Sequence, residues 1–71
     1  MRAFYSTQKH FRVFILGTPE GWQVSAIYDL QKQEWAEKGG RNEDTLKTAK
    51  ATAQEKVSLL LRMDAPEMKW H

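Results

Sequence analysis

The sequence predicts an α+β domain in which a three-stranded antiparallel β-meander is packed on one face by a single long C-terminal α-helix. Three segments support this prediction. Residues 10–16 are aromatic and β-branched, residues 22–29 alternate in polarity, and the chain beyond residue 45 carries an apolar stripe at helical spacing. The 71 residues suffice for one small domain, and we expect residues 1–63 to form it.

The first two predicted strands form a hairpin. Residues 10–16 contain the β-favouring run from Phe11 to Leu16. Residues 17–21 place Pro19 between two glycines, a composition typical of a turn. In the second strand every other residue is expected to point to one side of the sheet, and this set is Trp22, Val24, Ala26 and Tyr28.

A third, edge strand is predicted over residues 34–38, where Trp35 is the only large apolar residue. Its charged neighbours suit an edge that must not pair with another sheet. Gly39 and Gly40 then end the strand. Residues 1–9 are expected either to extend the first strand or to stay loose.

The C-terminal helix is predicted to begin at a cap formed by Asn42 or Asp44 and to continue to about Met63. Its apolar stripe comprises Leu46, Ala49, Ala53, Val57 and Leu60, with Leu61 at the margin. The alanines allow a close approach to the sheet, where we expect Trp22, Tyr28 and Trp35 to be the packing partners. Pro66 disfavours helix beyond this point, so residues 64–71 are predicted to form a flexible tail.

One face of this sheet is expected to lack a cover. If Phe11, Val13 and Ile15 contact the helix, an apolar patch remains on the other side, and it comprises Phe14, Leu16 and Ile27. Either the termini fold over this patch, or a second copy or another partner binds there. The leading hypothesis is a small intracellular protein-interaction module that self-associates as a homodimer through this face or through an edge strand, with Arg12 as a polar rim.

Nucleic-acid binding is the alternative hypothesis. The net charge is only +2, so any contact with phosphates would be weak. Arg12 and Phe14 would offer a stacking platform in this case. The basic residues near the start of the helix would hold the phosphates, and they are Lys38, Arg41, Lys47 and Lys50.

Other classes of function find no support in the sequence. The chain has no cysteine and two histidines, His10 and His71, and neither histidine has a second ligand at metal spacing. We therefore expect no metal site, no cofactor and no catalytic activity. No apolar run approaches the roughly 20 residues of a membrane span, which favours a cytoplasmic protein without membrane partners.

Two family resemblances each cover more than half of the chain. The stretch from Trp22 to Leu61 resembles the later part of a double-stranded-RNA-binding domain, with the pattern carried by residues 36–41 followed by Lys47, Ala49, Lys50 and Ala53. That resemblance implies strands leading into an alanine-rich helix that supports RNA contacts, although Glu43 and Asp44 stand where that family carries lysines. Residues 45–53, with Thr45, Ala49 and Ala53, resemble the helix of HicB-like antitoxins, which implies a similar sheet-and-helix unit.

Overall fold

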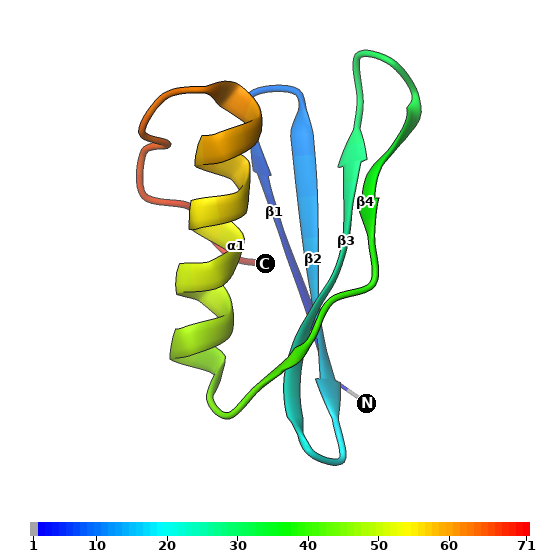
Figure 1. Cartoon of the computed structure of the whole chain (residues 1–71), viewed down its shortest axis with the longest axis vertical. Coiled ribbons are helices and arrows are strands. Elements are labelled where there is room, and N and C mark those ends of the chain that lie inside the picture. Colours follow the sequence, from blue (N-terminus) through cyan, green and yellow to red (C-terminus); the bar gives the residue numbers. More distant parts are fainter. Residues whose placement is uncertain (1) are drawn as a thin grey trace.

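A computed structural model describes residues 2–71, and Met1, which begins the segment 1–9, lies outside the described residues. Figure 1 shows an antiparallel sheet with a single helix packed on one side. In chain order the elements are β1 (Ala3–Gln8), β2 (Phe11–Thr18), β3 (Gly21–Asp29), β4 (Glu34–Lys38), β5 (Asn42–Glu43) and α1 (Leu46–Leu61). The structure thus confirms an α+β fold with an antiparallel sheet and one C-terminal helix.

The sheet contains more strands than the sequence predicts. Its order is β1-β2-β3-β4, and the short β5 also pairs with β3. Residues 3–8 form a separate strand antiparallel to β2, with Gln8 opposite Phe11. The chain reverses within two residues because Lys9 adopts a left-handed φ of 57°. The predicted count of three strands is therefore wrong, since the N-terminal segment pairs with β2 instead of extending it.

A β-bulge in β3 decides which side chains face the helix. Phe14 lies opposite Ala26, whereas the next residue, Ile15, lies opposite Val24, so Ser25 is an extra residue in the ladder. One extra residue shifts the alternation of side chains by one position. Val24 and Ile27 consequently both lie on the helix side of the sheet, where both are buried.

This bulge and a second irregularity, an extra residue at Ala36 of β4, overturn three placements made from the sequence. Ile27 belongs to the core and is fully buried, so its predicted position on the uncovered face is wrong. Tyr28 lies opposite Arg12, and Trp35 lies opposite Tyr28, which places both rings on the side away from α1. Only Trp22 of the three expected aromatic partners packs against the core.

The core fills the space between the sheet and α1. Ala49, Ala53 and Val57 of the helix are fully buried, and the two alanines let the helix approach the sheet closely. The strands contribute Phe11, Val13, Ile15, Val24 and Ile27. The predicted apolar stripe is confirmed as far as Val57. Beyond this residue it is Leu61, four residues further along, that packs against the core, whereas the predicted Leu60 is 36% exposed.

The helix begins later than the sequence predicts. Thr45 is the N-cap, and its Oγ1 accepts a hydrogen bond from the amide of Thr48 at 3.1 Å. Asn42 is unavailable for capping because it pairs with Gln23 in the sheet, so the predicted cap is wrong. The helix of 16 residues ends at Leu61, and the C-cap residue Arg62 adopts a left-handed φ of 57°. Among residues 2–71 no helix has the length and apolar character needed to cross a membrane.

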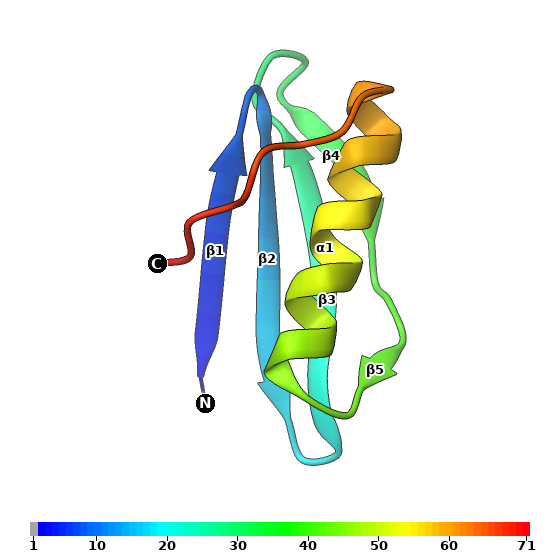
Figure 2. The same ribbon diagram turned by 90° about the vertical axis from the view of Figure 1, so that its left-hand side faces the viewer.

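The C-terminal segment crosses the sheet on the same side as α1 (Figure 2). Ala65 and Met68 are buried in the core, and Trp70 packs against it. The last residue, His71, exchanges two backbone hydrogen bonds with Tyr5, of 2.9 and 3.1 Å. The flexibility predicted for residues 64–71 stays a prediction, and these are the contacts that would have to break for the segment to move.

Candidate functional site

The face of the sheet opposite α1, which we call the outer face, has no helix or strand packed over it among the described residues (Figure 1). At the β1 edge of this face the ring of the C-terminal residue His71 lies beside that of Tyr5, with 5.5 Å between the ring centroids. Alternate residues of β2 point to the outer face because their neighbours Phe11, Val13 and Ile15 are buried on the helix side. Residues directly opposite one another in an antiparallel ladder share a face. The pairings therefore also place side chains of β1, β3 and β4 there, including Tyr5, Ala26 and Trp35.

Four aromatic rings form a continuous row across the outer face. We call this set, which comprises Tyr5, Phe14, Trp35 and Tyr28, the aromatic row. The ring centroids lie 6.5 Å apart for Tyr5 and Phe14, 6.1 Å for Phe14 and Trp35, and 4.9 Å for Trp35 and Tyr28. Tyr5 is 41% and Trp35 is 47% exposed, so the row offers accessible ring surface from the first strand to the fourth.

The charges of the outer face are cationic. Arg12 donates from Nε to Thr7 Oγ1 at 2.8 Å, and its guanidinium lies 5.2 Å from the centre of the Tyr5 ring. This position beside a ring face is favourable for a cation. Lys38 lies opposite Ala26 and so shares this face. Two cations thus flank the aromatic row.

The carboxylates of the strands lie on the helix side. Asp29 is buried opposite Phe11, and Glu34 lies opposite Asp29. Glu37 lies opposite the buried Ile27, and Glu43 lies opposite Trp22, which packs on the core. Nearby acidic charge comes from the C-terminal segment, where Glu67 lines a hollow at the β1 edge together with Tyr5 and Arg12 of the outer face. Along the strands, charge is therefore segregated by face.

The predicted partner-binding residues are brought together in part. Arg12, Phe14 and Leu16 alternate along β2 and share the outer face. Ile27 is absent from this set because of the bulge at Ser25. The outer face instead gains Tyr5, Tyr28 and Trp35, which the sequence interpretation left unassigned or placed under the helix. The available signal for Tyr5 was the alternation of β1, whose residues could have been matched to those of β2. Alternation does not place Trp35, because Ala36 is an extra residue of β4 between the pairs Ile27–Glu37 and Tyr28–Trp35.

The predicted basic cluster is not assembled. Lys38 lies on the outer face, whereas Arg41 forms an ion pair with Glu43, at 3.2 Å from Nε to Oε2. Lys47 and Lys50 belong to α1, in the opposite layer. The Lys50 ammonium lies 5.9 Å from the centre of the Phe4 ring. The sheet therefore separates Lys38 from the two lysines of the helix.

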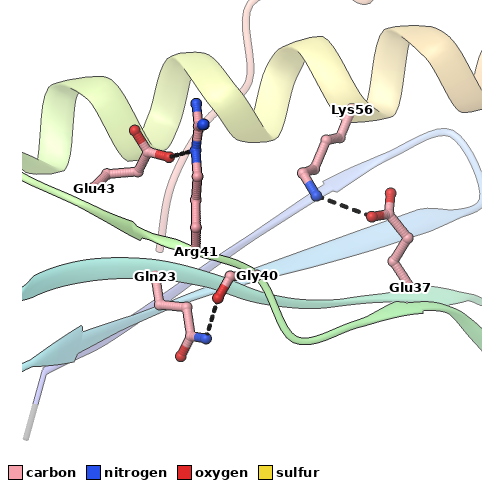
Figure 3. Close-up of polar contacts among 6 residues, drawn as sticks. All are labelled: Gln23, Glu37, Gly40, Arg41, Glu43 and Lys56. Carbon is pink, nitrogen blue, oxygen red and sulfur yellow. Dashed lines mark hydrogen bonds and ion pairs between the residues drawn. The ribbon is translucent and has the colours of Figure 1, made fainter.

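A groove of about 650 Å³ runs between α1 and the segment that joins β4 to β5. Two ion pairs flank it, as Figure 3 shows: Lys56 reaches from the helix to Glu37, at 2.9 Å, and Arg41 lies against Glu43. Gln23 donates to the carbonyl of Gly40 and fixes the course of this segment. Leu59 and Leu60 line the groove from the helix.

The outer face and the groove are two surfaces on which side chains of different elements converge. We found no significant match of the chain to a protein-family model, to a curated protein or to a solved structure. The chemistry of these two surfaces is therefore the basis for the functional proposals.

Proposed function

We propose that the chain binds single-stranded nucleic acid on the outer face of its sheet. The observation that supports this most directly is the aromatic row, with Tyr5 and Trp35 as its most exposed rings. Every nucleobase has a flat π-face, and stacking on an aromatic side chain contributes about 1–3 kcal/mol per base. Bases stack on protein rings in this way only when they are unpaired, so a single strand fits the face better than a duplex does.

The charge pattern supports the same ligand. Arg12 and Lys38 lie beside the rings, and the strand carboxylates lie on the opposite side of the sheet. A phosphate backbone that follows the bases across the face meets cations and no strand carboxylate. With only two cations on this face, the electrostatic contribution is small, and stacking supplies most of the affinity.

Self-association through the outer face is the competing hypothesis for the same surface. Its support is the exposed apolar area of Tyr5, Phe14, Leu16 and Trp35. Two copies packed face to face would, however, bring Arg12 and Lys38 into an interface whose strands supply no carboxylate to pair with them. Unpaired charge at an interface is costly, and for this reason we favour the nucleic acid.

Fluorescence anisotropy with a labelled oligothymidylate of roughly ten nucleotides tests the proposal. We expect Tyr5→Ala and Trp35→Ala each to weaken binding by about 5- to 150-fold, the equivalent of the stacking contribution of one base. The matched control is Trp35→Phe, which keeps a ring in place and should retain most of the affinity. Arg12→Gln should lower the slope of log affinity against log salt by about 0.7.

Two results would reject nucleic-acid binding on this face. One is the absence of measurable binding by the folded wild-type chain at low salt. The other is binding that Tyr5→Ala and Trp35→Ala leave unchanged. A concentration-dependent mass that Phe14→Glu abolishes in a still-folded protein would instead support self-association through the outer face.

A further inference from the structure

The C-terminal end of α1 and the residues just after it carry an exposed apolar patch on the layer opposite the aromatic row. Leu59 is 72% and Met63 is 52% exposed. Both side chains line one shallow hollow, together with Glu55, Ser58, Arg62 and Asp64. We call the set Glu55, Leu59, Arg62 and Met63 the helix patch. Leu59 and Glu55 also line the groove beside β4, so the patch continues into that groove.

The two charged residues of the helix patch make no side-chain hydrogen bond or ion pair within residues 2–71. The two ion pairs that the described residues form join Arg41 to Glu43 and Lys56 to Glu37. Glu55 precedes Leu59 by one turn of α1. Arg62, the C-cap residue just beyond the helix, lines the same hollow as both, and so does a second carboxylate, that of Asp64. The patch therefore presents an acid and a base on either side of a leucine.

This arrangement is complementary to itself. A two-fold axis through the patch, perpendicular to α1, would set the helix of a second copy antiparallel to the first. Glu55 and Arg62 are separated by about 10 Å along the helix axis. The axis would bring Leu59 against its own copy and would place each Glu55 beside Arg62 of the other chain. An isologous interface requires this property, since the same surface must serve on both sides.

We propose that the helix patch is a homodimer interface, and that its occupant is a second copy of this chain. The exposed leucine and methionine form its apolar centre, and the two Glu55–Arg62 pairs form a polar rim around it. The area is small, because one helix end supplies most of it, so the dimer forms at high rather than low protein concentration.

This dimer goes beyond the proposed nucleic-acid function and does not depend on it. The helices pack against each other between the two sheets, so both outer faces point away from the interface and remain accessible. A dimer would thus carry two aromatic rows, and a long single strand that reached both would bind with higher apparent affinity than either alone.

Light scattering coupled to size-exclusion chromatography measures the molar mass of the protein in solution. The measurement is made at protein concentrations from micromolar to millimolar. We expect the mass to rise from 8.3 kDa towards twice this value as the concentration increases. Leu59→Glu should remain monomeric throughout, whereas the control Leu30→Glu, at an exposed leucine in the β3–β4 turn, should dimerise as the wild type does. Circular dichroism verifies that both variants are folded.

Reversing the charges of Glu55 and Arg62 tests whether these two residues pair across the dimer interface. Glu55→Arg alone and Arg62→Glu alone each replace two attractive pairs by two repulsive ones, and each should weaken dimerisation by about tenfold. The double variant restores opposite charges and should restore the dimer, as should an equimolar mixture of the two single variants.

Three results would overturn the proposal: a wild-type mass of 8.3 kDa at every concentration, a dimer that survives Leu59→Glu, or a double variant no better than the single ones. Nucleic-acid binding is measured at a low protein concentration, at which the chain is monomeric. A negative result in the binding experiment therefore does not affect the dimer proposal, and a negative result in the mass measurement does not affect the binding proposal.

Discussion

Ser25 has more influence on the candidate site than its small side chain suggests. Ser25 is the extra residue of the bulge between β2 and β3. It therefore exchanges the two sides of the sheet to which the later side chains of β3 point. Ile27 thereby enters the core next to Val13, while Tyr28 turns to the outer face. The Ser25 hydroxyl lies 3.5 Å from the Phe14 carbonyl, a weak contact at most. Ser25, together with the extra residue Ala36 of β4, thus decides which aromatic side chains a ligand can reach.

A pair of aspartate substitutions tests this facing. Ile27→Asp would bury a charge without a partner among apolar side chains, and we expect it to cost several kcal/mol and to unfold a domain of this size. Phe14→Asp, on the outer face of the neighbouring strand, should leave the chain folded because its carboxylate stays in contact with water. Urea denaturation monitored by circular dichroism compares the two. Equal losses of stability would contradict the assignment of faces.

Among the elements, α1 depends on contacts at both of its ends. Thr45 caps its first turn, and the hydroxyl of Thr48 also contacts that of Thr45, at 2.8 Å. Further along, Lys56 connects the helix to Glu37 of β4. At its C-terminal end, Ser58 accepts a hydrogen bond at Oγ from the backbone amide of Ala65 and so holds the start of the C-terminal segment.

The cap gives a prediction at this scale. Thr45→Ala removes the acceptor for the Thr48 amide and should lower the free energy of unfolding by about 1 kcal/mol. Asp44→Ala is the matched control, since its exposed side chain makes no hydrogen bond within the part of the chain that the structure describes, and it should change stability by less than about 0.5 kcal/mol. Chemical denaturation of both variants measures the difference. A larger loss of stability in Asp44→Ala than in Thr45→Ala would show that Asp44 is the cap.

At the scale of the whole molecule, the C-terminal segment acts as a second cover for the sheet. α1 covers part of one face of the sheet. Residues 64–71 cross the rest of this face towards β1 (Figure 2). Gln54 donates to the Ala65 carbonyl at 3.2 Å, and His71 pairs with the backbone of Tyr5. A domain of 71 residues buries a limited apolar area, so the burial of Met68 is a substantial part of its core.

This packing predicts a difference between two methionines. Met68→Ala opens a cavity in the core and should cost about 2–4 kcal/mol. Met63→Ala, at a half-exposed position, should cost less than about 0.5 kcal/mol in dilute, monomeric protein. Denaturation curves give both values, and hydrogen exchange should show the Tyr5 amide protected. If both substitutions lowered the free energy of unfolding only slightly and the Tyr5 amide exchanged fast, the C-terminal segment would be the flexible tail that the sequence predicts.

The local pattern of residues is sufficient to predict the fold class and most of the elements. Residues 22–29 and 34–38 form strands as predicted, and the stripe from Leu46 to Val57 packs on the sheet. Alternation along β2 also assigns Arg12, Phe14 and Leu16 to one face. These features depend on neighbours a few residues apart, and periodicity reports such neighbours directly.

Contacts between distant segments decide the rest. Residues 3–8 become a strand only because β2 offers them an edge, and Asn42 leaves the helix cap to Thr45 because it pairs with Gln23. The position of the bulge is set by how two strands fit together, which the alternation of one strand does not contain. The sequence by itself therefore determined an antiparallel sheet with one covering helix. The tertiary structure decided that Tyr5, Phe14, Tyr28 and Trp35 share a face, because side chains from separate strands meet only through their pairing.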